Sequence, residues 1–373
     1  MSLANEGRKN KAYMVDNQRL KYIDLGAGIM ILYMVIGHVL LFAWGIETSW
    51  SQDSISESPR TFFPYLSFFM PYFFYKSGMF FKKKPIQQLL IRDSKKLLLN
   101  YAIWGLIGYV LYIIMRLIDR TATLRNCTYS VLRIIFLRGT PPENEALWFL
   151  LTLFGVRFLA NVLLPLEDQR YKRQFYLRCS SVIVLGYIIS FLSHTYSHNS
   201  WPWWIANGAA GLAFFCAGYM LRDYGMKKWM IYPCLFVYII CCIVGFPYVG
   251  LLDNKLLTGN YLLWVPVSVC CIIAFNYICV VLVKMQEYIL VKYNLKSYLL
   301  RFFENVGICA MPIYVSHYLI LQCYSYVISH NQFDYPHTIV LTILECGLIM
   351  AIILTHQYKE SKKMKNNLKT IIE

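Results

Sequence analysis

The sequence predicts an all-α, polytopic membrane protein with about ten transmembrane helices and both termini in the cytoplasm. The first observation is composition, because 58% of the 373 residues are hydrophobic and only 15% are charged, against about 45–50% and 25% in soluble domains. The second is a series of apolar segments long enough to cross a bilayer as helices. The third is the placement of basic residues in alternate connections. Together they exclude a soluble single-domain enzyme.

The apolar segments divide the chain into three parts. Residues 1–21 form a basic cytoplasmic N-terminus, residues 22–355 the transmembrane domain, and residues 356–373 a basic cytoplasmic tail. Roughly 17–25 apolar residues are needed to cross the hydrocarbon core as a helix. The expected spans are 22–45, 62–81, 98–118, 147–166, 177–194, 203–221, 230–249, 260–283, 303–327 and 338–355.

The distribution of Lys and Arg orients these spans. Of the 36 basic residues, 27 fall in the segments that lie inside when the termini are inside, and 6 fall in the outer loops. Because cytoplasmic loops carry the excess of Lys and Arg, we expect both termini in the cytoplasm. The net charge of +16 then serves orientation and contact with anionic membrane lipids, and nucleic acid is not an expected partner.

The longest outer connection, residues 119–146, contains a short apolar stretch, CTYSVLRIIFLRG. Arg133 and Arg138 interrupt it, so it is too short and too charged to cross. It is typical of an interfacial or re-entrant helix. A hydrophobic loop without regular structure is the alternative.

His38 is the most informative polar residue in the first span. It lies 16 residues after Tyr22, which is about 24 Å along a helix and past the middle of the bilayer. A neutral imidazole is tolerated there and can take a proton from an alcohol, as a general base must. The alternative is a histidine hydrogen-bonded to a neighbouring helix. Asp24, at the cytoplasmic mouth of the same span, is either a substrate contact or a simple interfacial carboxylate.

Small residues occupy the inner half of the same span. Gly26, Ala27 and Gly28 follow one another, and they leave room either for another helix packed closely or for a slim acyl donor. Ala27 and His38 are eleven residues apart, about three helical turns, so they share a helix face.

Six motifs occur in one order along residues 20–330: YIDLGAGIMILYMVIGH, FFMPYFFYKSGMFF, RDSKKLLLNYAIW, ALWFLLTLF, FFCAGYMLR and MPIYVSH. In this order they resemble acyltransferase family 3, the integral-membrane acyltransferases that O-acylate bacterial surface glycans. The resemblance implies an acyl-CoA as co-substrate, most simply acetyl-CoA, a glycan or lipid-linked sugar as acceptor, and location in the cell inner membrane. The twelve cysteines include no CxxC pair, so no metal is expected.

The resemblance also implies roles for matching residues. His38 matches the histidine of the first span, and His317 the histidine that follows the IY pair in the ninth; both are candidate catalytic residues. Trp148 matches the tryptophan of the fourth-span motif and is a candidate substrate contact. Arg92 and Lys95, one helical turn apart, match a basic pair that follows the second span. With Lys96 they are candidates for holding the phosphates of the donor.

The sequence departs from the family pattern at two places. Ala27 stands where relatives carry Arg or Lys, and Phe69 stands where they commonly carry a histidine before the MP pair. Lys76 could supply the missing cation, because it and Ala27 are each five residues from the inner end of their span, a depth of about 7.5 Å. The alternative is that Lys76 snorkels to the inner headgroups.

Arg157 lies near the centre of the fourth span and keeps its charge, so it needs a carboxylate, carbonyl groups or a water-filled cavity. Glu345 in the tenth span is an available partner. The alternative is contact with the acceptor or with a pyrophosphate.

The chain is therefore expected to be a membrane-bound O-acyltransferase, with an acetyl group the simplest transferred unit. In a direct transfer, His38 removes the acceptor's proton while donor phosphates are held from the cytoplasmic side. A covalent acyl-histidine that carries the group outward is the alternative mechanism. Two alternatives stay open. One is a polysaccharide exporter or flippase of the same fold, since the two departures could mean that the chemistry was lost. The other is transfer of succinyl or another acyl group.

Overall fold

The computed structural model describes residues 21–47, 66, 68–166, 173–196, 203–222, 227–246, 261–293, 298–330 and 337–372. Helices account for the regular structure of these residues, and no strand occurs among them. The all-α class is therefore confirmed. It is the expected solution for a chain in lipid, because a helix satisfies its own backbone hydrogen bonds.

The first half of the described chain contains α2 to α7, with short π- and 3₁₀-helical pieces between them. The elements are α2 (Lys21–Glu47), α3 (Phe69–Met79), α4 (Ile86–Asp93), the π-helix η4 (Ser94–Leu98), α5 (Leu99–Ile118), the π-helix η5 (Asn126–Ser130), α6 (Val131–Arg138), the 3₁₀-helix η6 (Glu145–Leu147) and α7 (Trp148–Leu163).

The second half contains α8 to α14. These are α8 (Arg173–Tyr196), α9 (Trp203–Leu221), α10 (Lys228–Val244), α11 (Tyr261–Tyr293), α12 (Tyr298–Ile308), α13 (Ala310–His330) and α14 (His337–Ile372).

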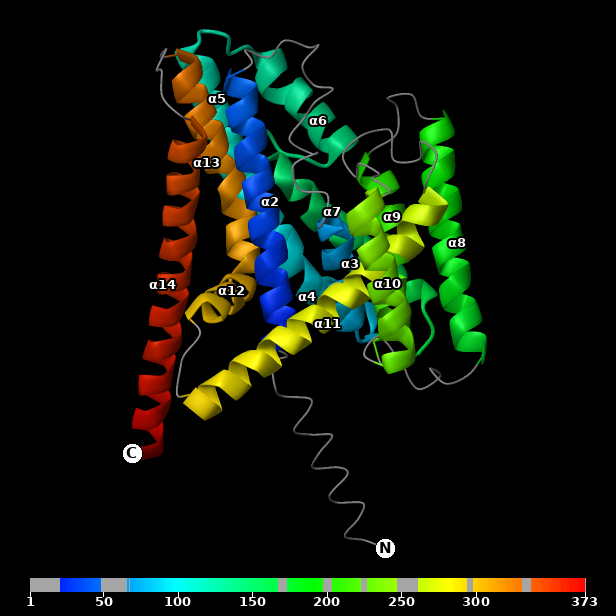
Figure 1. Cartoon of the computed structure of the whole chain (residues 1–373). Helices are drawn as coiled ribbons and strands as arrows, with labels where there is room; N and C mark the ends of the chain where they lie inside the picture. Colours follow the sequence, from blue (N-terminus) through cyan, green and yellow to red (C-terminus); the bar gives the residue numbers. More distant parts are fainter. Residues whose placement is uncertain are drawn as a thin grey trace, which may run out of the picture.

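Helix α2 runs through the middle of the molecule (Figure 1) and packs against α3, α11, α12, α13 and α14. Helix α9 packs against α8, α3 and α7, whereas α10 packs against α11. The beginning of α2 and the end of α14 lie at the same end of the molecule. Which side of a membrane this end faces stays a prediction.

Glycines let several of these helices approach closely. A Cβ atom built on Gly78 of α3 would lie 2.0 Å from the carbonyl oxygen of Phe215, and one on Gly218 of α9 would lie 2.1 Å from that of Tyr75. Gly28 of α2 and Gly307 of α12 are packed equally closely, with built Cβ atoms 1.9 Å from Phe303 O and 1.8 Å from Asp24 O. Small residues thus hold helix pairs in backbone contact, so the small-residue stretch of α2 packs against another helix.

The expected span over 303–327 is not one straight helix. Helices α12 and α13 meet at Cys309 with a bend of 82°. Pro312 lies in the first turn of α13, where its ring is tolerated because an N–H there has no partner within the helix. It also has no N–H to bond back across the bend to Ile308 of α12. The bend directs α13 upward beside α2 and leaves α12 across its lower half (Figure 1).

Five described helical stretches are long and apolar enough to cross a membrane: Lys21–Ala43, Ile86–Ile118, Glu145–Leu163, Leu263–Tyr293 and His337–Lys363. The bent pair of α12 and α13 makes a sixth if it crosses as one unit. Ten spans therefore stay a prediction, as do the three sequence divisions. The outer connection does contain a helix, α6, which exposes Leu132 and Phe136. Its location at a membrane interface, and the side chains of Arg133 and Arg138, lie beyond what is described.

Candidate active site

Two histidines from distant parts of the chain meet between α2 and α13. The Nδ1 atom of His38 lies 2.9 Å from the Nε2 atom of His317, across 279 residues of sequence. Their rings are nearly parallel, with an interplanar angle of 11° and centroids 5.2 Å apart. His317 is fully buried, whereas His38 is partly exposed. His38 is therefore the less buried residue of the two.

The surroundings of His317 define where the protons lie in the neutral pair. Its Nδ1 atom is 2.9 Å from the carbonyl oxygen of Tyr314 and 3.2 Å from that of Ile313. Carbonyl oxygens only accept hydrogen bonds, so Nδ1 of His317 carries the hydrogen and its Nε2 atom accepts. His38 then donates through Nδ1, which leaves a lone pair on its own Nε2. This is the arrangement of a general base held by a second group.

Tyr318 connects this pair to the loop before α7. Its ring lies edge-on to His38, with centroids 5.5 Å apart, and also to His317, at 6.1 Å. Its hydroxyl donates to a carboxylate oxygen of Glu145 at 3.4 Å, and Phe42 packs edge-on against the same ring at 5.3 Å. Tyr318 thus fixes both imidazoles from one side.

The loop before α7 is held against the helix turn that carries His317. Tyr314 donates a hydrogen bond to the carbonyl of Ala146, and the side-chain amide of Asn144 donates to the carbonyl of Val315 at 2.9 Å. Tyr318, Asn144 and Glu145 were not predicted from the sequence. The only local signals were a tyrosine directly after His317 and a polar ENE sequence directly before the ALW motif.

Trp148 lies in the aromatic core beneath this loop. It is 4% exposed and packs edge-on against Phe149, with centroids 6.1 Å apart. Phe149 in turn contacts the ring of Tyr314 at 5.7 Å. Trp148 therefore supports the turn of α13 that bears His317, and direct contact with substrate stays a prediction.

Arg157 takes a carboxylate partner that the sequence did not indicate. Its Nε atom lies 2.7 Å from Oδ2 of Asp93, and Nη1 donates to the hydroxyl of Ser77 at 3.0 Å. Its guanidinium also lies 5.6 Å from the ring centre of Phe81. The expected pairing with Glu345 is therefore wrong, and Asp93, which is 3% exposed, is the partner.

The predicted donor contacts surround this ion pair. Arg92 lies 3.3 Å from Asp93 through its Nε atom, and Lys95 and Lys96 are exposed on η4. A π-helical turn at this place is notable, because such turns often occur at functional sites. Arg157 is eleven residues after Ala146 on the same helical stretch, so the basic cluster lies about 17 Å along α7 from the level of the histidine pair.

Lys76 and Asp24 complete the predicted site residues. Lys76 lies in the last turn of α3, directly before the Ser77 that binds Arg157, and is partly buried. Asp24 is 7% exposed in the first turn of α2, and its backbone carbonyl packs against Gly307. Neither residue contacts the histidine pair in the described structure. Ala27 of α2, where relatives carry a cation, is fully buried.

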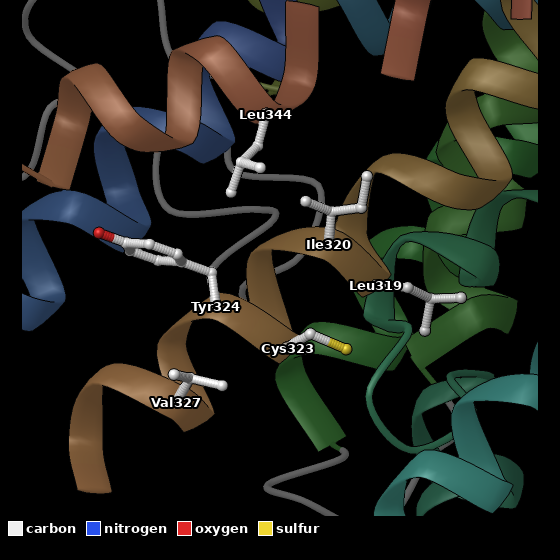
Figure 2. Close-up of a pocket in the computed structure, with 6 residues that line it drawn as sticks. All are labelled: Leu319, Ile320, Cys323, Tyr324, Val327 and Leu344. Carbon is white, nitrogen blue, oxygen red and sulfur yellow. The ribbon is translucent and has the colours of Figure 1, made fainter. Parts of the chain in front are cut away.

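An apolar pocket of about 350 Å³ lies between α13 and α14 (Figure 2). Figure 2 shows Leu344 of α14 extending toward Ile320 and Tyr324 of α13. Its lining lacks both histidines. On the same helix α14, Glu345 is 2% exposed, and neither of its carboxyl oxygens has a hydrogen-bond partner in the described part of the chain.

Among the residues that the structure describes, no three His, Cys, Asp or Glu side chains gather as a metal site would require. Comparison with known proteins gives one result. The family model described as an acyltransferase domain matches residues 20–356, nearly the whole chain. No curated protein matches, and no solved structure matches.

Proposed function

Because the chain belongs to this acyltransferase domain family, we propose that it transfers an acyl group from acyl-CoA to a sugar hydroxyl of a cell-surface polysaccharide or its lipid-linked precursor. Acetyl-CoA is the simplest donor, and the cell inner membrane the location. The observation that carries the proposal is the pair of His38 and His317, with Nδ1 to Nε2 at 2.9 Å. With its hydrogen on Nδ1 directed at His317, His38 keeps a lone pair on Nε2, and this suits activation of an alcohol.

The proposed reaction is a direct transfer. The Nε2 atom of His38 takes the proton of the acceptor hydroxyl as the oxygen attacks the thioester carbonyl carbon. The tetrahedral intermediate collapses, the carbon–sulfur bond breaks, and the proton passes from His38 to the leaving thiolate. The products are an O-acylated sugar and free coenzyme A.

His317 acts in this scheme as a positioning residue. Its Nε2 atom accepts the hydrogen bond from His38 and so fixes both the tautomer and the orientation of that ring. When His38 becomes protonated, the same contact stabilises the imidazolium. Its own Nδ1 proton is anchored on the carbonyl groups of Ile313 and Tyr314, so the pair keeps its direction through the reaction.

The donor is proposed to bind at the other end of α7. Arg92, Lys95 and Lys96 offer cations for the phosphates of coenzyme A, and Lys76 of the neighbouring helix adds another. The long pantetheine arm is the part of acyl-CoA that can bridge the roughly 17 Å from this level to the histidines. The buried pair of Asp93 and Arg157 supports this region by tying α4 to α7.

The experiment compares surface glycans from cells with and without the gene by mass spectrometry. A mass shift equal to one acyl group supports the proposal and identifies acetyl or succinyl. Purified protein in lipid nanodiscs is then tested for binding of acetyl-CoA. No glycan shift together with no acyl-CoA binding would overturn the proposal in favour of export, which the departures at Ala27 and Phe69 keep as the second candidate.

A further inference from the structure

The loop residues Glu143, Asn144 and Glu145 lie against the turn of α13 that carries His317, to which Asn144 and Glu145 are hydrogen-bonded. Asn144 is bonded to the carbonyl of Val315, two residues before His317. Glu145 accepts from Tyr318, whose ring contacts both histidines. We call this loop segment the polar wall, and Tyr318 connects it to both histidines.

Asn144 has a buried oxygen that nothing in the described chain satisfies. The residue is fully buried, and its Oδ1 atom has no hydrogen-bond partner, although its Nδ2 atom is used. Such an orphaned acceptor is costly and needs a donor from water or a ligand. A sugar hydroxyl is a donor of the required kind.

The two flanking carboxyl groups are close enough to influence one another. Burial raises the pKa of Glu143, the charge of Glu145 raises it further, and Arg116 opposes the shift. Glu143 also has a positive φ of 56°, a conformation that a residue with a side chain keeps only where its surroundings hold it. Ionised carboxylates only accept hydrogen bonds, so the wall as a whole presents acceptors.

We propose that Glu143, Asn144 and Glu145 bind the acceptor sugar through its hydroxyl groups, and that the acceptor unit is therefore a neutral or amino sugar and not a uronic acid. The role of the bound sugar as acyl acceptor rests on the proposed function, and the charge of the polar wall adds the class of sugar. A sugar carboxylate at this wall would meet two like charges in a partly desolvated place, which selects against it.

The test measures binding and transfer separately on the full-length protein in nanodiscs. The probes are three octyl glycosides that differ in one group: a hexoside, the corresponding hexosamine and the corresponding hexuronide. Wild-type protein is expected to bind the hexuronide about tenfold more weakly than the hexoside. In the double variant E143Q/E145Q, which keeps size and shape, this difference is expected to fall to about threefold or less.

The matched control is Glu287→Gln, which removes one carboxylate that pairs with Lys21 at the other end of the molecule. It is expected to leave the discrimination unchanged. His38→Ala should keep sugar binding while losing acyl transfer, which separates this proposal from the proposed function. Equal binding of hexoside and hexuronide by wild-type protein, or unchanged discrimination in the double variant, would overturn the assignment even if transfer is observed.

Discussion

The Nδ1 atom of His38 is 2.9 Å from the Nε2 atom of His317, and the far nitrogen of His317 is bound by two backbone carbonyl groups. The hydrogen bonds therefore run in one direction, from His38 through His317 to the backbone of α13. One nitrogen, Nε2 of His38, is left to accept a proton. The first two predictions follow from this direction.

Replacing His38 with alanine removes the proposed base. We expect acyl transfer to fall by about a hundredfold or more, the range for a positioned acid or base. The measurement is the rate of transfer from labelled acetyl-CoA, with insertion checked by size-exclusion chromatography. Near wild-type transfer by a normally inserted variant would remove His38 from the reaction.

Replacing His317 with alanine should reduce kcat less than the change at His38, with little effect on KM. Gln carries a carbonyl oxygen near the position of Nε2 and can accept from His38, so His317→Gln should recover part of the rate. A merely structural role would give no such recovery. A larger loss at His317 than at His38 would exchange their roles.

Changing Arg92 or Lys95 to alanine should raise the KM for acyl-CoA about tenfold, since a hydrogen bond to a charged group contributes about 1.5–3 kcal/mol. The acceptor KM should change little. Lys284→Ala removes an exposed cation from α11 and serves as the control. If the double variant R92A/K95A binds acyl-CoA as tightly as the wild-type protein does, the donor phosphates bind elsewhere.

Asp93→Asn should destabilise the fold, because it leaves the charge of Arg157 in a largely buried place. The two side chains are 4% and 12% exposed, and breaking a buried pair costs about 3–5 kcal/mol. Thermal unfolding in detergent measures the effect. Glu287→Gln breaks the pair with Lys21, in which the Glu287 side chain is 54% exposed and the Lys21 side chain 60%. This change should alter the free energy of unfolding by less than about 1 kcal/mol. Equal effects would contradict a structural role for Asp93.

Gly28→Ala and Gly307→Ala should each lower the melting temperature and the yield of folded protein. Their added methyl groups would lie within 2 Å of the carbonyl oxygens of Phe303 and Asp24, which are rigid backbone atoms. Gly155→Ala of α7 meets no atom within 4 Å and should be neutral or stabilising by up to about 1 kcal/mol. Tolerance at Gly28 equal to that at Gly155 would mean that α2 and α12 are not in backbone contact.

The sequence by itself determined the all-helical class and indicated His38 as the candidate base. Both depend on local signals. Long apolar runs can satisfy their backbone in lipid only as helices, and a polar residue within such a run is expensive enough to indicate a function. The family motifs added His317, because their order along the chain can be recognised without knowing how the helices pack.

Only the tertiary structure decided which residues meet. Arg157 pairs with Asp93 and not with Glu345, and Tyr318 donates a hydrogen bond to Glu145 in the segment before α7. Such partners depend on the rotation and register of each helix against its neighbours, and on the 82° bend between α12 and α13. Hydrophobicity in a membrane does not fix those angles, because lipid and the protein interior are equally apolar. They are fixed by close packing at glycines such as Gly28 and Gly307, which takes effect only when two distant segments come together.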